Sequence, residues 1–225
     1  MTFSIVAHCP QNRMIGMAIC SSSPAVAARC AHARAGVGAV ASQNITDPAL
    51  GIRGLDLLAA GASAAQALDI LIASSAHIAY RQLALVDFRG GSKTFSGEHA
   101  LGIHATAEAP HVATAGNLLQ HPGVPHAMLE AYLSNPKAPL PDRLLAALVA
   151  ARESGGEAGR VHSAGLLVVD TLSWPAIDLR IDWQDNDPIA ALTKLWERYR
   201  PQRDDYIRRA LDPRSAPSYG VAGDP

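Results

Sequence analysis

The sequence predicts an α+β fold, and three observations on the 225-residue chain support this class. The first 44 residues hold short apolar runs separated by Pro, Gln and Asn, a pattern typical of antiparallel strands joined by a hairpin. Later segments carry apolar residues three and four positions apart, which is typical of helices packed on a sheet. With 48% hydrophobic and 17% charged residues, the chain can bury one substantial core. We therefore expect a single domain over residues 1–211.

Three strands are predicted near the N-terminus. The alternating run 2–7 is followed by a tight connection at 9–13 and by a second apolar run at 14–20. An Ala-rich stretch then leads to Arg34 and to a third strand over residues 35–44. Small residues dominate these strands, which indicates close packing between layers.

The central segments predict helices laid over a sheet. A helix containing Leu55 ends at Gly61, and the sequence Ser63-Ala64-Ala65-Gln66 is a capping box that starts the next helix. Further elements are predicted at the following ranges: strands 82–87, 93–95 and 111–115, and helices 122–133 and 141–154.

The C-terminal third begins with a Gly-rich loop at residues 155–159. Strands are predicted at 164–169 and 177–183, and Asp187-Pro188 is a helix start, because Asp is a good N-cap and Pro suits the first helical position. Alternation places Asp178, Arg180 and Asp182 on one strand face as a solvated ladder, an ion-pair network or a substrate anchor. Pro, Ser and Gly content predicts a disordered tail over 212–225.

Composition excludes several classes of function. The net charge of −1 and 5% aromatic content disfavour nucleic-acid binding, and no apolar run is long enough for a membrane span. The three cysteines, Cys9, Cys20 and Cys30, are widely spaced and suit a reducing compartment. No signal peptide is visible in the sequence, so we expect a cytoplasmic protein with a small-molecule substrate. We also expect a homo-oligomer, and no metal or cofactor.

Thr2 is the first candidate for chemistry. If Met1 is removed, as expected when a small residue follows it, Thr2 carries both a hydroxyl and a free α-amine. The amine can take the hydroxyl's proton during attack on a carbonyl, and its pKa near about 7.7–8.0 leaves a useful fraction unprotonated at neutral pH. The alternative is an ordinary strand start.

Several separated segments carry a resemblance to a known family. The segments, which run in order from Thr2 to about Tyr199, are "TFSIVA", "ARAGVGAVASQN", "GIRGLDLLAAGASAAQALDILI", "YRQLALVD", "FSG", "AGNLL", "RLLAALVAARESGGEAGRVHSAGLLVV" and "DLRIDWQDNDPIAAL". They closely resemble the domain-of-unknown-function family 1028, which is grouped with the N-terminal-nucleophile hydrolases. The resemblance implies a four-layer αββα sandwich of two stacked, mostly antiparallel sheets, and an amidohydrolase that uses Thr2.

The same resemblance suggests partners for Thr2. Proteasome-type members of that superfamily have an acidic residue after the second strand and a lysine before the third. Here Arg34 occupies a position similar to that of the lysine, and Ser21-Ser22-Ser23 stands where the acidic residue is expected. The resemblance therefore implies Arg34 as an electrostatic helper and leaves the route of the proton open.

Further candidates would line the same site. Gly116-Asn117 is either a turn or a source of oxyanion donors, with Asn117 assigned to the catalytic set. The candidate substrate-binding residues, whose arginines would hold a carboxylate-bearing small amide or cyclic ureide, are Ser22, Ser23, Gln43, Asn44, Arg53, Arg81, Gly116, Arg160 and Ser163.

Three other functions stay open. Val161-His162-Ser163-Ala164-Gly165 is near the nucleophile-elbow pattern of serine hydrolases, but it lacks the first Gly and its strand follows the Ser. A ligand-binding or scaffolding protein with this fold is the second alternative. A metal-dependent hydrolase is the third, with His104 and His111 as ligands, and their spacing disfavours it.

Overall fold

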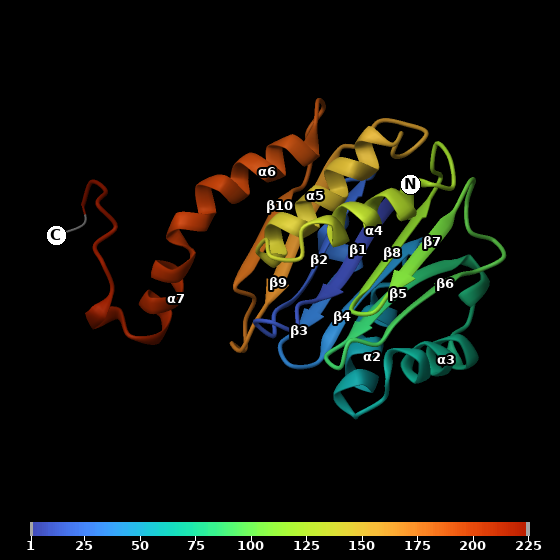
Figure 1. Cartoon of the computed structure of the whole chain (residues 1–225), viewed down its shortest axis with the longest axis horizontal. Coiled ribbons are helices and arrows are strands. Elements are labelled where there is room, and N and C mark those ends of the chain that lie inside the picture. Colours follow the sequence, from blue (N-terminus) through green and yellow to red (C-terminus); the bar gives the residue numbers. More distant parts are fainter. Residues whose placement is uncertain (1, 224–225) are drawn as a thin grey trace.

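The computed structural model describes residues 2–223, and these form a mixed α/β fold with two antiparallel sheets (Figure 1). The larger sheet has six strands in the order β10-β9-β2-β1-β8-β7. Their bounds are β1 Thr2–His8, β2 Ile15–Ser21, β7 Ala105–Ala109, β8 Val112–Asn117, β9 Ser163–Val169 and β10 Ile177–Ile181. The smaller sheet has the order β3-β4-β5-β6, with β3 Ala31–Arg34, β4 Gly38–Asn44, β5 Arg81–Asp87 and β6 Ser92–Ser96.

Helices cover both outer sides of the paired sheets. Their bounds are α1 Val26–Cys30, α2 Pro48–Ala59, α3 Ala64–Ser74, α4 Val124–Ser134, α5 Leu140–Glu153, α6 Pro188–Tyr199 and α7 Arg203–Leu211, with short 3-10 turns at Ile78–Tyr80, Arg200–Gln202 and Pro213–Ser215. Figure 1 shows α4 and α5 over the larger sheet and α2 and α3 against the smaller one.

Three layers of apolar side chains hold these elements together. One lies between the larger sheet and helices α4 to α6, and includes Phe3 and Leu144. A second, built from small residues such as Ala41 and Ala115, lies between the two sheets. The third joins β4 and β5 to α2 and α3, with Leu71 fully buried. The small side chains of the middle layer let the two sheets approach closely.

Strand β1 has different neighbours on its two faces. Phe3 and Ile5 point toward the helices, whereas Val6 packs between the sheets. Ser4 also faces the second sheet, where its hydroxyl donates to Gln43 Oε1 over 2.6 Å. Because side chains alternate along a strand, Thr2 lies on the same face as Ser4 and Val6. The first residue of β1 is therefore turned toward the space between the sheets.

Local sequence signals correspond well to the observed elements. Strands β1 and β2 form the predicted hairpin, and the capping box of Ser63 and Gln66 starts α3. Asp187 caps α6 by accepting a hydrogen bond from the Ala190 amide.

Two predictions about strands need correction. Gly116-Asn117 is not a turn: both residues belong to β8, where Gly116 pairs with Phe3 and Asn117 with Thr2. The segment before residue 44 forms two strands, β3 and β4, because the chain reverses at residues 35–37. Strand β7 at residues 105–109 was not predicted from the sequence.

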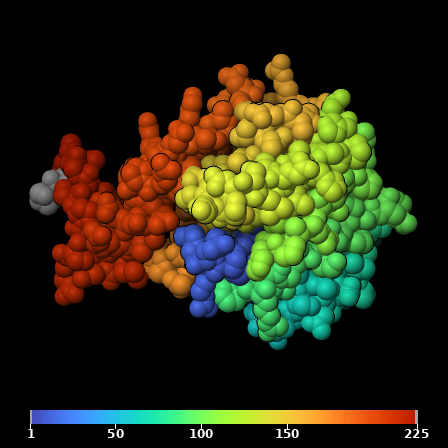
Figure 2. All heavy atoms as spheres, viewed as in Figure 1, coloured from blue at the N-terminus to red at the C-terminus, as the bar shows by residue number. Residues whose placement is uncertain are grey.

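The C-terminal segment extends away from the sheets, and Figures 1 and 2 show α7 and the residues after it as a projecting arm. Within the arm, the Arg209 guanidinium lies 3.8 Å from the Tyr219 ring centroid and donates to the Pro217 carbonyl over 3.0 Å. Residues 224 and 225 of the predicted disordered tail lie outside the described residues. Among residues 2–223, no helix has the length and apolar character needed to cross a membrane.

Candidate active site

Thr2 lines a cavity of about 360 Å³ at the junction of the two sheets. The lining residues come from β1, the 22–25 turn, α1, the end of β4, the segment after it and the start of α2: Thr2, Ser23, Arg29, Cys30, Asn44, Thr46 and Pro48. Thr2 itself is 4% exposed, so its hydroxyl is at the floor of the cavity rather than on the surface. The predicted removal of Met1 concerns a residue outside the described ones.

A chain of hydroxyl groups links Thr2 to a cation. Thr2 Oγ1 lies 3.2 Å from Ser21 Oγ, which lies 3.0 Å from Ser23 Oγ. The Arg29 Nη2 group donates to Ser23 Oγ over 2.9 Å. Ser21 and Ser23 therefore connect the Thr2 hydroxyl to a guanidinium. A cation held at the end of such a chain favours the negatively charged form of the hydroxyl.

Arg29, and not Arg34, is the arginine of this cavity. Arg34 forms an ion pair with Asp56 over 2.8 Å, and both side chains are largely exposed. Its Cα pairs with Gly38, six residues along β4 from Asn44. At a rise of about 3.3 Å per residue, that separation is about 20 Å. The predicted role of Arg34 beside Thr2 is therefore wrong.

Asn117 is part of a buried amide network next to Thr2. Its Nδ2 group donates to Gln82 Oε1 over 3.0 Å, and Gln43 Nε2 donates to the same oxygen over 2.8 Å. Gln82 in turn donates to the Gly116 carbonyl. Asn117 is fully buried, and its Oδ1 atom has no hydrogen-bond partner among residues 2–223. This network joins the two sheets beside Thr2, and Asn117 lies behind the residues that line the cavity.

Asn44 and Cys30 shape the opposite wall. Asn44 adopts a left-handed conformation with φ of 75°, and its Nδ2 group donates to the Tyr80 carbonyl over 2.6 Å. The Cys30 thiol lies 3.3 Å from Thr46 Oγ1. Burial raises the pKa of the Cys30 thiol, so this group stays protonated and does not compete with Thr2 as a nucleophile.

Ser163 has a structural role. Its hydroxyl donates to the Ser23 carbonyl over 2.6 Å and accepts from the Val26 amide over 3.2 Å. Ser163 also pairs with Ser21 across the sheet. Both hydrogen bonds hold the turn that carries Ser23, so the geometry does not favour Ser163 as a nucleophile.

We expect Ser163→Ala to lower the free energy of unfolding by about 1–3 kcal/mol, because two buried backbone groups lose their partner. Urea unfolding measures this change. A matched Ser92→Ala variant, which removes a half-buried hydroxyl bonded to one carbonyl, should cost less. An effect of Ser163→Ala no larger than that of Ser92→Ala would contradict the structural role.

The other predicted arginines do not line the Thr2 cavity. Arg53 donates to Ser74 Oγ over 2.8 Å and joins α2 to the end of α3. Arg81 pairs with Asn44 across the sheet and donates to the Ile45 carbonyl. It therefore holds the Asn44 wall of the cavity in place without lining the cavity itself. Arg160 lines a different cavity. The three predicted substrate-binding arginines, Arg53, Arg81 and Arg160, are therefore not brought together at this cavity.

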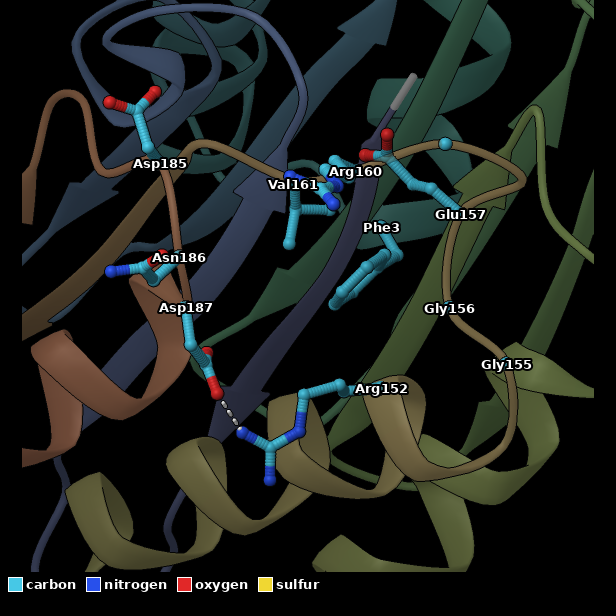
Figure 3. Close-up of a pocket in the computed structure, with 11 residues that line it drawn as sticks. Phe3, Arg152, Gly155, Gly156, Glu157, Arg160, Val161, Asp185, Asn186 and Asp187 are labelled. Carbon is cyan, nitrogen blue, oxygen red and sulfur yellow. Dashed lines mark hydrogen bonds and ion pairs between the residues drawn. The ribbon is translucent and has the colours of Figure 1, made fainter.

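A second cavity, of about 530 Å³, lies on the helix side of Phe3 (Figure 3). Arg152 and Asp187 form an ion pair of 2.5 Å at one end. Glu157, which is 6% exposed, lies at the other end, and burial raises the pKa of its carboxyl to about 8. Ser22 lies close enough to favour the ionised carboxylate, but neither carboxylate oxygen makes a hydrogen bond of ordinary geometry within residues 2–223.

Sequence reasoning missed Arg29 and Glu157. In the sequence, Arg29 lies in an Ala-rich stretch directly before Cys30, and no other local pattern indicates that it belongs to a site. The structure places both residues in the short helix α1. Glu157 lies in a Gly-rich loop, and no local pattern indicates that this loop reaches β1.

Comparison with known proteins identifies relatives of the chain. The profile described as "Family of unknown function (DUF1028)" matches residues 2–192. The crystal structure of protein SPO2555 from Silicibacter pomeroyi, of the same family, is 31% identical with a TM-score of 0.85, covering 92% of this chain and 90% of that chain. No curated protein matches the chain.

A second solved structure, Anbu (ancestral beta-subunit) from Yersinia bercovieri, is 11% identical and covers 89% of this chain and 95% of that chain. Its TM-score of 0.39 is too low to establish a shared fold. The match over residues 2–192 and the agreement with SPO2555 show that this chain belongs to the DUF1028 family.

Proposed function

We propose that this protein is an amidohydrolase of the N-terminal-nucleophile type, which cleaves a small amide or cyclic ureide through an acyl-enzyme on Thr2. One observation carries the proposal: the Thr2 hydroxyl lines an inter-sheet cavity and connects through Ser21 and Ser23 to Arg29. Two antiparallel sheets with helices outside agree with the four-layer αββα arrangement of such hydrolases.

The reaction follows from the groups on Thr2 once Met1 is removed. Thr2 Oγ1 attacks the amide carbon, a C–O bond forms, and the α-amine takes the hydroxyl proton. Collapse of the tetrahedral intermediate breaks the C–N bond, and the ammonium returns the proton to the leaving nitrogen. A water molecule then attacks the ester, with the same amine as base, and regenerates Thr2. Asn117 would donate its second amide hydrogen to the developing oxyanion.

The cavity limits the substrate. A volume of about 360 Å³ is near the lower end of ligand sites, which run from about 300 to 1,000 Å³. Polar groups of Ser23, Asn44 and Thr46 line it, and Arg29 contributes positive charge. A small polar amide with a carboxylate fits these features better than a peptide chain does.

The proposal is tested with two measurements that need no known substrate. Intact-protein mass should show that protein made from its natural start lacks Met1. A β-lactone probe, which acylates a hydroxyl by ring opening, should then add its mass to the N-terminal peptide. Retention of Met1, or labelling at residues other than Thr2, would overturn the hydrolase and favour the non-catalytic ligand-binding protein that is the main alternative.

Arg29 provides a further prediction. We expect Arg29→Gln to slow acylation of Thr2 by the β-lactone by about 10- to 100-fold, since a hydrogen bond to a charged group contributes about 1.5–3 kcal/mol. Labelling rates followed by mass spectrometry measure this.

Arg34→Gln is the matched control, because Arg34 pairs with Asp56 at the surface. It should label at the wild-type rate. Equal slowing by both substitutions would point to a general effect of charge and not to the hydroxyl chain.

A further inference from the structure

Glu157 lies next to the N-terminal end of β1, and the pairing of the two neighbouring strands establishes this position. In β8, Asn117 pairs with Thr2, and two residues further on Leu119 forms a bridge with Glu157. In β2, Ser21 pairs with Thr2, and the next residue, Ser22, lies beside the Glu157 carboxyl. Both strands that flank Thr2 therefore lead to Glu157. Figure 3 shows its carboxylate beyond Phe3, at the end where β1 begins.

The loop that carries Glu157 is tied to the sheet. The Gln120 amide donates to the Gly156 carbonyl over 3.0 Å, and the Ala158 amide donates to the Leu118 carbonyl over 2.9 Å. Gly155 and Gly156 have φ of 103° and 57°, which lets the chain leave α5 and turn back toward β8. These contacts hold the Glu157 side chain at a defined place.

The carboxylate of Glu157 has no cationic side chain as an ion-pair partner among residues 2–223. Both of its oxygens are buried without a hydrogen bond of ordinary geometry, Ser22 beside them favours the carboxylate but brings no positive charge, and no basic side chain in that range pairs with it. The nearby Arg152 is paired with Asp187, and the Cys20 thiol, whose pKa is raised by burial and then by Glu157, is itself neutral. A buried carboxylate without a partner is costly, which points to a cationic ligand at this position.

We propose that Glu157 is the positioning residue for the α-amine of Thr2 in the chain that begins at Thr2. The inference rests on the proposed function, because it requires that Met1 is removed. The carboxylate accepts a hydrogen bond from the amine and fixes its orientation relative to Thr2 Oγ1. When the amine takes the hydroxyl proton, the resulting ammonium is stabilised by Glu157 until it passes the proton to the leaving nitrogen.

The acidic residue Glu157 comes from the loop at residues 155–159, on the helix side of β1. The negative charge and the hydroxyl chain of Ser21 and Ser23 then approach Thr2 from different directions.

The test measures the pKa of the Thr2 α-amine in the full chain, released from an N-terminal fusion so that Thr2 is the first residue. The rate of acylation by acetic anhydride as a function of pH, read on the N-terminal peptide, gives this pKa. We expect the wild-type value to lie above the ordinary range of about 7.7–8.0, and Glu157→Gln to lower it by about one unit. Glu153→Gln, which removes an exposed carboxylate four residues away, should leave it unchanged.

A second measurement on the wild-type sequence covers the case in which Glu157→Gln does not fold. Carbon-13 NMR of the Glu157 carboxyl should show a lower pKa when the Thr2 amine is free than when it is acetylated. Equal amine pKa values in wild type and Glu157→Gln, or equal Glu157 titration in the two wild-type forms, would overturn the inference. Neither measurement depends on turnover. If the pKa values show the ion pair between Glu157 and the Thr2 α-amine but the β-lactone does not label Thr2, only the proposed hydrolase function is overturned.

Discussion

Thr2→Ala should abolish acyl transfer while leaving the fold intact. The hydroxyl is the atom that forms the covalent intermediate, so its loss should reduce β-lactone labelling of residue 2 and any amide hydrolysis by at least about 10³-fold. Thr2 pairs with Ser21 and Asn117 through the backbone, and those hydrogen bonds do not need its side chain. The free energy of unfolding should therefore change by about 1 kcal/mol or less.

Two further substitutions separate the chemical role of the Thr2 hydroxyl from the effect of the shape of its side chain. Thr2→Val keeps the branched side chain and lacks the hydroxyl, so it should be as inactive as Thr2→Ala. Thr2→Ser keeps the oxygen and the amine, so it should be partly active. The mass of each variant must show that Met1 is removed. Full activity in Thr2→Val would exclude Thr2 as the nucleophile and leave the ligand-binding alternative.

The elements predicted well are those with local signals. The hairpin follows from Pro10 and its polar neighbours, and α3 follows from Ser63 and Gln66, whose reciprocal hydrogen bonds form within four residues. Strand β7 was missed because its sequence, Ala-Thr-Ala-Glu-Ala, has low strand propensity. It exists because β8 offers it a partner edge, which is a tertiary effect.

The candidate site was predicted only in part, for a related reason. Thr2 was found from its position alone, and Ser23 and Asn44 were found because Ser23 follows β2 and Asn44 is the last residue of β4. Arg34 was misplaced because the residues before it form α1 and β3, which carry Arg34 along β3 away from Thr2. The same rearrangement brings Arg29 to the cavity.

Glu157 could not be predicted at all from the sequence. Its place depends on the bridge to Leu119, a contact between segments 38 residues apart. No sequence pattern in a Gly-rich loop predicts which strand the loop will contact. The burial of the carboxyl, which is the observation that makes it informative, exists only once the loop has closed.

Moving the α-amine away from Thr2 should be nearly as damaging as removing the hydroxyl. A lysine inserted between Met1 and Thr2 keeps Met1 in place, because a large residue then follows it, and turns the Thr2 nitrogen into an amide that cannot accept a proton. Loss of a general base costs about 10²- to 10⁴-fold, so β-lactone labelling at Thr2 should fall by that amount although its hydroxyl is unchanged. The same protein released from a fusion to begin at Thr2 should label at the wild-type rate, which controls for the fold. If the extended chain labels as fast as the released one, the base is not the amine, and the hydroxyl chain through Ser21 and Ser23 would have to carry the proton instead.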